Sequence, residues 1–278
     1  MSKNKNNTTS PLYRFFHVII IIALLGVVIY EAVMIYKDQS EYSAAVNEYD
    51  SIKDTYVKPA ETDPGDAYSE SPEDYPKLDI NFAALEEINS DFIGWLYFPA
   101  FSKINYPIVK EQSINQYLYK TFDGKNNKAG AIFMDVLSDE NFCGLSDMIF
   151  GHNMKNQSMF GSLKSLYKSG DENPLEKDPF IYIYTKDKIL KYRVFSYYIT
   201  TDGSYSYTEV KDHEGYDEYL KFVKRNSMMD IPNDISFEDY PSLLTLSTCQ
   251  GQSGSGRRFV VHSVKVDTFV NSDLTDIQ

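Results

Sequence analysis

Hydrophobic residues form one long run near the start of the chain and then recur in short alternating stretches. Val18 to Tyr30 is uninterrupted apolar sequence, and Ala32 to Tyr36 extend it past Glu31. The 22 residues from Phe15 to Tyr36 match the length of about 20 residues that a helix needs to cross a bilayer. The pattern therefore predicts a transmembrane helix over residues 15–36, with Glu31 near its outer end.

A polar section separates this run from the rest of the chain. Residues 40–57 carry Tyr42, Val46, Tyr49 and Ile52 at helical spacing, which predicts a short helix. Residues 58–77 are dense in Pro, Glu, Asp, Ser and Gly, and such a composition cannot bury a core. We therefore expect a tether and linker over residues 37–77 and a globular domain over residues 78–278.

Short apolar stretches bounded by turn residues predict about eight β-strands in the globular domain. Pro107 suggests that the second of them is an edge strand. Lys186-Asp187 is expected to turn the fifth into the sixth as a hairpin. The predicted strands are Phe92–Phe98, Lys103–Val109, Ala129–Met134, Asp147–Phe150, Phe180–Tyr184, Ile189–Thr200, Leu243–Ser247 and Phe259–Val266.

Helical spacing is confined to a few short segments. It predicts helices over Phe82–Ile88, Phe160–Tyr167 and Tyr216–Met229. Strands and helices do not alternate as in βαβ units, and no internal repeat is present. The domain is therefore predicted to be mainly β, with a closed or nearly closed β-barrel.

Charge near the apolar run predicts how the chain is oriented. Lys3, Lys5 and Arg14 precede the run without an acidic residue, whereas acidic residues follow it from Asp38 onward. The positive-inside bias predicts a cytoplasmic tail over residues 1–14 and an extracellular position for everything after Lys37. A cleaved signal peptide is the alternative, but its apolar region would be shorter, about 7–15 residues, and would precede a small-x-small site.

Composition narrows the class of protein. Aromatic residues make up 15% of the 278 residues, which suits a pleated, β-rich fold. The net charge is −13, and no long basic run follows residue 14, so we expect no nucleic-acid partner. The sequence has neither a CxxC nor an HExxH motif, so it gives no support for a zinc site.

One of the two cysteines is placed for chemistry. Cys249 ends an apolar strand and precedes a loop rich in Gly and Ser, whereas Cys143 lies in a polar stretch. A buried free cysteine is usually inert, but an exposed thiol can attack a carbonyl carbon. Arg257 and Arg258 begin the next strand, where a guanidinium could hold the charge that develops. Alternation sends these two arginines to opposite faces, and the pattern alone does not choose between them.

His152 is the candidate acid–base group among the four histidines. It follows a short strand beside Gly151, at a position where loops commonly carry function. His17 lies in the apolar run, and His213 lies in an acidic loop. His262 lies inside a strand, on the face opposite Val261.

Several motifs together resemble the sortases, and the class B sortases in particular. TLSTC at Thr245–Cys249 is followed nine residues later by the arginine that opens RFVVH, and GHNM occupies Gly151–Met154. The resemblance extends over about residues 78–266. Four further stretches carry it in the expected order: GWLYFPA at 94–100, INYPIVK at 104–110, GAIFMD at 130–135 and SMFGSL at 158–163.

The resemblance implies an eight-stranded sortase-type barrel with N-terminal helices and a helix before the cysteine strand. It implies a single-pass protein in the cell membrane of a Gram-positive bacterium. Cys249 would be the nucleophile, His152 the general acid and base, and Arg258, with Arg257 as the alternative, the oxyanion-stabilising group. Ser247 is similar to a groove-shaping residue of class B, whereas Ile114 stands where an Asn is usual. No cofactor or metal is implied.

The same resemblance implies a cysteine transpeptidase. Such an enzyme would cleave a C-terminal sorting signal of the Asn-Pro-x-Thr type on a secreted surface protein through a thioacyl-enzyme. It would then join the Thr carbonyl to an amine of a cell-wall peptidoglycan precursor. The alternatives are a sortase that polymerises pilins, a Cys–His peptidase that only hydrolyses, and an inactive barrel that serves as a scaffold.

Overall fold

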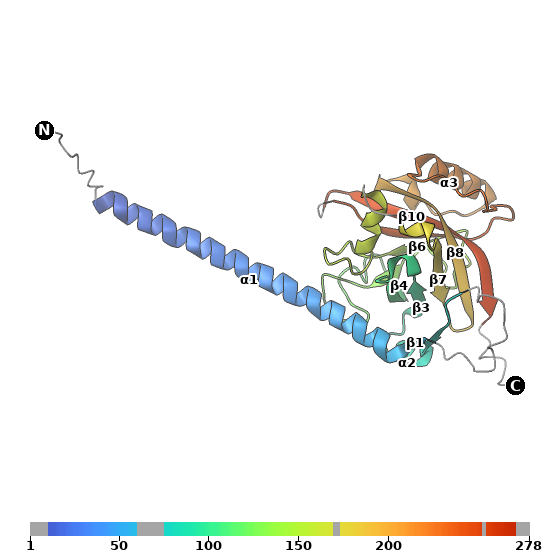
Figure 1. Cartoon of the computed structure of the whole chain (residues 1–278), viewed down its shortest axis with the longest axis horizontal. Coiled ribbons are helices and arrows are strands. Elements are labelled where there is room, and N and C mark those ends of the chain that lie inside the picture. Colours follow the sequence, from blue (N-terminus) through green and yellow to red (C-terminus); the bar gives the residue numbers. More distant parts are fainter. Residues whose placement is uncertain (1–10, 60–74, 169–172, 252–253, 271–278) are drawn as a thin grey trace. The chain divides into compact units, whose positions relative to one another are not determined.

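The structure is a computed structural model that describes residues 11–59, 75–168, 173–251 and 254–270. It separates into two compact units, Met1–Ala44 and Ala45–Gln278. The first described helix, α1, runs without a break from Pro11–Tyr56 (Figure 1). By length and composition it could cross a membrane. The sequence predicted two separate segments here, but no helix-breaking proline lies between Pro11 and Pro59, so one helix continues through both.

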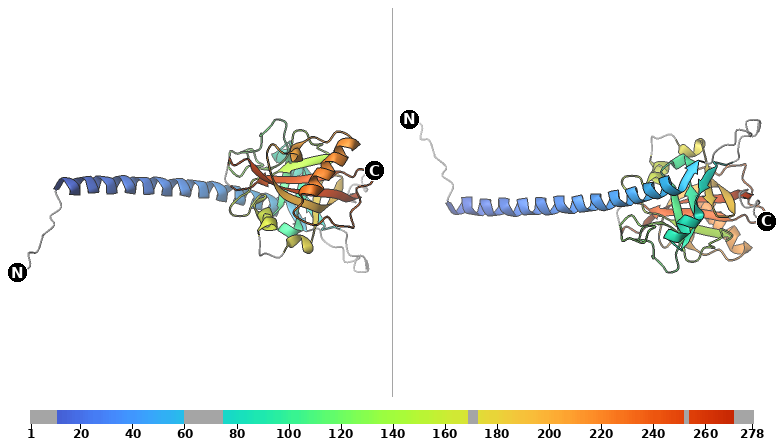
Figure 2. Two further views of the ribbon diagram at one scale, coloured as in Figure 1. Left: turned by 90° about the horizontal axis from the view of Figure 1, so that it is seen from above. Right: turned by 90° about the horizontal axis from the view of Figure 1, so that it is seen from below.

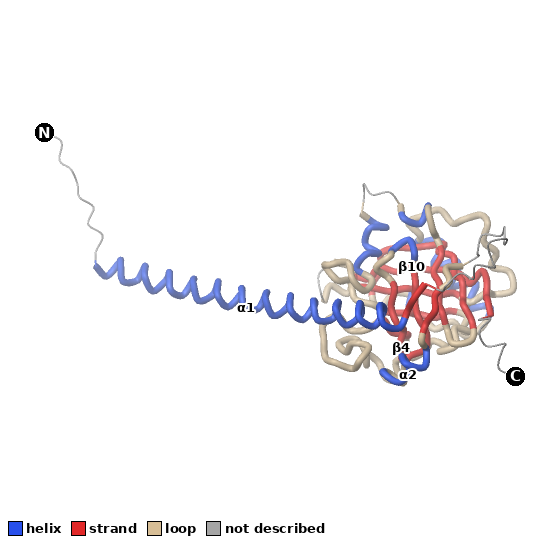
Figure 3. Tube along the Cα trace, turned by 60° about the horizontal axis from the view of Figure 1, so that its bottom comes forward, coloured by secondary structure: helices blue, strands red, loops and turns tan. Residues whose placement is uncertain are grey.

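Eight strands close into a barrel in the order β10-β8-β7-β3-β4-β5-β6-β9, which confirms the predicted fold class. Figure 3 shows the strands in red. The neighbours β4–β5 and β6–β9 are parallel, and the other neighbours are antiparallel. The strands are β3 Phe92–Tyr97, β4 Asn105–Lys110, β5 Ile132–Met134, β6 Ser146–Phe150, β7 Phe180–Tyr184, β8 Lys188–Thr201, β9 Leu243–Cys249 and β10 Arg257–Val270.

Short helices connect the strands. The helix α2 is capped by the Asn81 side chain, which accepts a hydrogen bond from the N–H of Ala84, and Asp212 caps α3 in the same way. The segment predicted as a helix at residues 160–167 is a 3-10 helix. The helices are α2 Phe82–Ile88, η2 Pro99–Phe101, η3 Gly161–Tyr167, η4 Pro174–Glu176, η5 Tyr205–Tyr207 and α3 His213–Asn226.

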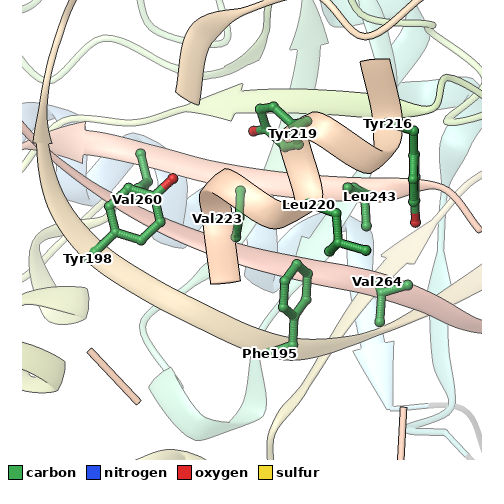
Figure 4. Close-up of a cluster of buried hydrophobic side chains, with 9 residues drawn as sticks. All are labelled: Phe195, Tyr198, Tyr216, Tyr219, Leu220, Val223, Leu243, Val260 and Val264. Atoms are coloured by element: carbon green, nitrogen blue, oxygen red, sulfur yellow. The ribbon is translucent and has the colours of Figure 1, made fainter. Parts of the chain in front are cut away.

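The helix α3 lies against the outside of the barrel, before the strand that ends in Cys249 (Figures 1 and 2). Its apolar face packs on side chains from β8, β9 and β10 (Figure 4). Full burial of one such large side chain contributes about 1.5–3 kcal/mol, so this face holds the helix in place. The cluster consists of Phe195, Tyr198, Tyr216, Tyr219, Leu220, Val223, Leu243, Val260 and Val264.

The barrel unit begins upstream of the expected boundary at Leu78. Ala45, Tyr49 and Ile52 of α1 are buried, and strand β1 (Val57–Pro59) pairs with β2 (Leu78–Ile80). The compact unit therefore includes the end of α1, which the sequence analysis had assigned to the tether. Residues 60–74 of the predicted linker lie outside the described residues.

Two local expectations were wrong. Pro107 does not mark an edge, because β4 pairs with β3 on one side and with β5 on the other. Pairing with β5 begins only at Ile108, so the ladder tolerates a residue without an N–H. The strand predicted from Ala129 is shorter, because Gly130 has a φ of +59° and the extended backbone begins at Ile132.

His262 generates a test of how the barrel is stabilised. Its ring is fully buried, and its Nδ1 lies 2.9 Å from the Thr245 hydroxyl. Burial lowers the pKa of His262 to about 3. His262 therefore binds a proton near pH 6.5 in the unfolded chain but stays neutral in the folded chain. The folded state becomes less stable as the pH falls below 6.5.

We predict that wild type loses up to about 2 kcal/mol more unfolding free energy between pH 6.5 and pH 5 than His262→Asn. Chemical unfolding at the two pH values measures the difference. Equal losses in wild type and His262→Asn would contradict the prediction.

Candidate active site

The site is built on three neighbouring strands, with β9 between β6 and β10. The register of β9 and β10 is unbroken from Arg258 opposite Cys249 to Val264 opposite Leu243. Directly opposed residues of an antiparallel pair place their side chains on the same face of the sheet. Cys249 and Arg258 therefore share a face, and alternation places Ser247 on it as well.

The register also distinguishes the two arginines. Arg257 precedes the residue opposite Cys249, so its side chain starts on the other face, and it is exposed. Arg258 is partly buried and lines the pocket that also contains Cys249. Strand pairing thus places Arg258, and not Arg257, on the face of Cys249.

His152 reaches the same pocket from the other side of β9. The parallel pair β6–β9 places Phe150 beside Ser247, and the N–H of Gly151 donates to the Ser247 carbonyl at 3.1 Å. His152 follows immediately. A cavity of about 250 Å³ is lined by His152, Cys249, Arg258 and Ser247 together.

The loop after β4 holds the His152 ring. Its Nε2 lies 2.7 Å from the Leu118 carbonyl oxygen, so Nε2 donates and the neutral ring keeps Nδ1 free as an acceptor. The ring also stacks on Tyr119, with centroids 5.9 Å apart. Burial lowers the pKa of His152 below its ordinary value of 6.5, and the Leu118 carbonyl partly offsets that effect.

Two glycines allow this close approach. A Cβ at Gly151 would lie 2.6 Å from the Ile132 side chain and 2.7 Å from the Phe160 ring. A Cβ at Gly130 would lie 2.6 Å from the Leu118 carbonyl oxygen and 3.1 Å from Cδ2 of His152. At both positions, neighbouring atoms therefore fill the space that a side chain would need.

Asn153 links the histidine loop to the cysteine strand. Its Nδ2 donates to the Cys249 carbonyl at 2.8 Å. The N–H of Phe160 donates to the His152 carbonyl at 3.0 Å, so the loop is held on both sides of the histidine. Asn153 belongs to the GHNM motif, but no sequence pattern predicts this contact.

Arg258 is oriented by a residue that the sequence analysis missed. Its Nη2 lies 3.3 Å from Oδ2 of Asp202, and its Nη1 donates to the Arg257 carbonyl at 3.1 Å. The Arg258 side chain keeps 27% of its exposure, so donors remain accessible from the pocket. Asp202 lies far from Arg258 in the sequence and belongs to no motif, so no sequence pattern indicates this contact.

Ser247 is a buried wall residue of the pocket. Its hydroxyl lies 2.8 Å from the Tyr207 hydroxyl, and burial raises the pKa of Tyr207 to about 12. Tyr207 therefore stays protonated, and the two hydroxyls form a fixed polar edge beside Cys249. Tyr207 is a second residue that sequence reasoning missed.

Apolar and acidic side chains complete the pocket. Ile114, Leu118, Phe133 and Phe150 give the pocket apolar walls, and Glu111 and Asp135 add two acidic side chains. Cys143 and Cys249 are both free thiols, and Cys143 is exposed. Within the described residues, no group of three or more His, Cys, Asp or Glu could hold a metal ion.

The chain is similar to known proteins in both sequence and fold. The family model for the Sortase domain matches residues 96–266. Sortase B of Staphylococcus aureus is 29% identical over 182 residues, which cover 65% of this chain and 72% of the relative. Sortase B of Listeria monocytogenes is 31% identical over 166 residues, which cover 59% of this chain and just under two thirds, 65%, of that relative.

A solved structure extends the likeness to the fold. Sortase B from Bacillus anthracis in complex with AAEK1 superposes with a TM-score of 0.65 at 27% sequence identity. The match covers 82% of this chain and 99% of that one. The stretch matched by the family model contains His152, Cys249 and Arg258.

Proposed function

This chain belongs to the sortase family of cysteine transpeptidases, and we propose that it acts on secreted proteins that carry a C-terminal sorting signal of the Asn-Pro-x-Thr type. The observation that carries the proposal is the pocket shared by Cys249, His152 and Arg258. A thiol, an imidazole and a guanidinium around one cavity suit acyl transfer at a peptide carbonyl.

The first half-reaction forms a thioacyl-enzyme. The Cys249 thiolate attacks the carbonyl carbon of the Thr residue, because thiolate is the nucleophilic form. Arg258 donates hydrogen bonds to the oxyanion of the tetrahedral intermediate. His152 protonates the amine of the residue after Thr, and the peptide bond breaks as that amine leaves.

An amine then resolves the thioacyl-enzyme. His152, now neutral, takes a proton from the incoming amine as its nitrogen attacks the thioester carbon, and Cys249 leaves as thiolate. The acceptor in this proposal is the amine of a cell-wall peptidoglycan precursor. The product is an amide between the Thr carbonyl and that amine.

The N-terminal helix supports a location for the reaction at the outer face of the cell membrane. In the proposal, residues 15–36 of α1 anchor the chain in the cell membrane by a single pass. Residues 1–14 are cytoplasmic by the positive-inside bias, and the catalytic domain faces outward. Such an anchor keeps the thiol where secreted proteins emerge and where the cell-wall precursor is available.

The decisive test supplies a panel of Asn-Pro-x-Thr peptides to the full chain with candidate amines, including the peptidoglycan stem-peptide amine. Mass spectrometry should show the peptide cleaved after Thr and joined to the amine, and Cys249→Ala should abolish both products. Hydrolysis alone, unaffected by added amine, would contradict the transpeptidase proposal in favour of a Cys–His peptidase. Preference for a pilin lysine would indicate the pilin-polymerising alternative.

Substitution of the two arginines tests the oxyanion assignment. Loss of one such donor costs about 2.7–4 kcal/mol in comparable enzymes, so we expect Arg258→Ala to lower turnover by about 100–1,000-fold. Arg257→Ala should change turnover by less than about twofold, because the exposed Arg257 side chain lies on the other face. Steady-state kinetics measure both, and the reverse ranking would move the role to Arg257.

The dependence of kcat/KM on pH tests the role of His152. Activity should rise as thiolate forms and fall as the imidazolium loses its proton, giving a bell-shaped profile. Burial lowers the pKa of His152, so the limb of the profile that reports its imidazole should lie at lower pH than for an exposed histidine. Initial rates between pH 5 and pH 10 measure the profile. A monotonic rise to pH 10 would rule out His152 as the acid.

A further inference from the structure

Tyr49 lies on α1 but makes its polar contacts inside the barrel unit. Its side chain is buried, and its hydroxyl donates to the Gly130 carbonyl at 2.8 Å. The same hydroxyl accepts a hydrogen bond from the N–H of Phe122 at 3.1 Å. Its ring packs edge-on against Tyr106, with centroids 5.4 Å apart. One phenol group thus holds two points of the loop between β4 and β5.

That loop is the support of His152. The Leu118 carbonyl accepts from Nε2 of His152, and the N–H of Ala131 donates to the Tyr117 carbonyl at 3.2 Å. Two points of the loop are therefore tied together beside the ring. Gly130 lies at this junction, because a Cβ there would contact the Leu118 carbonyl oxygen and the His152 ring at once.

We propose that Tyr49 is a positioning residue for the transpeptidation reaction, acting through the Gly130 and Leu118 backbone to hold His152. The inference rests on the proposed function of the site. It assigns a role in the active site to the part of α1 that directly follows the predicted membrane anchor. Tyr49 touches neither the reacting atoms nor the pocket, so its effect is transmitted by the loop alone.

The chemistry of the hydroxyl fits this role. Burial raises the pKa of Tyr49 well above its ordinary value, so the phenol remains a hydrogen-bond donor throughout the working pH range. The preceding residue adds a weaker tie, because Oε1 of Glu48 accepts from the N–H of Asp123 at 3.3 Å. Two consecutive side chains of α1 therefore hold the same loop.

Tyr49→Phe is the direct test, because it keeps the ring and removes only the hydroxyl. The matched control is Tyr216→Phe in α3, where a buried tyrosine also donates to a backbone carbonyl, that of Pro241, at 2.8 Å. Full-length wild type and both variants are compared in detergent micelles by three measurements: denaturant unfolding, steady-state kinetics with an Asn-Pro-x-Thr peptide, and NMR titration of His152.

We expect Tyr49→Phe to lower kcat about tenfold with KM within about twofold, because the catalytic group is displaced while the peptide groove is intact. The pKa of His152 should fall, since a displaced Leu118 carbonyl no longer supports the imidazolium. Tyr216→Phe should lose stability but keep the wild-type kcat and His152 titration.

The other groups at the pocket are unchanged in both variants. Tyr119 stacks on the ring, and Glu111, Asp135, Cys249 and Arg258 line the same cavity. A difference in the titration of His152 therefore reports the loop. If Tyr49→Phe and Tyr216→Phe match in kcat and in the pKa of His152, Tyr49 is only structural and the proposal is overturned.

Two safeguards keep the test decisive. Should Tyr49→Phe fail to fold, the partly exposed Glu48→Ala loosens the same loop, and an unchanged His152 titration in it overturns the proposal. The titration also separates two failures. A wild type that transfers no peptide contradicts the proposed function, whereas the response of the His152 pKa to Tyr49→Phe decides the positioning role without any activity.

Discussion

The pairing of β9 with β6 on one side and β10 on the other is the constraint on which the site depends. Backbone hydrogen bonds along β9 set which residues are opposite one another, and a slip of one residue would turn every side chain to the other face. In the observed register Cys249 lies opposite Arg258, and His152 emerges beside it from the end of β6. Main-chain geometry thus places the cysteine between an imidazole and a guanidinium.

One face of these strands serves two purposes. Near Leu243 and Val264 it is covered by α3 and contributes to the apolar cluster that holds that helix. Toward Cys249 the cover ends, and Tyr207 and Ser247 form the boundary between buried core and open pocket. Stability and chemistry therefore come from successive positions of the same strand, because packing at one end secures the register that the other end needs.

Local patterns predicted those elements whose neighbours in space are also neighbours in sequence. The hairpin of β7 and β8 and the helix α2 appear close to where alternation and spacing placed them. Pro107 and the end of α1 were misjudged for a common reason. Whether a strand lies at an edge depends on which strands pair with it, and whether a segment is a tether depends on what packs against it. Both properties therefore depend on contacts with distant segments.

The sequence by itself determined the anchor-like helix, the mainly β class and the presence of a thiol, an imidazole and two guanidiniums at strand ends, because periodicity and motif are local properties. Only the tertiary structure placed Arg258 rather than Arg257 on the face of Cys249, brought His152 into the same pocket, and joined Asp202, Tyr207 and Tyr49 to the surrounding residues. Strand register and burial are set by partners far along the chain, and no local pattern of residues encodes which partner a strand or a side chain will meet.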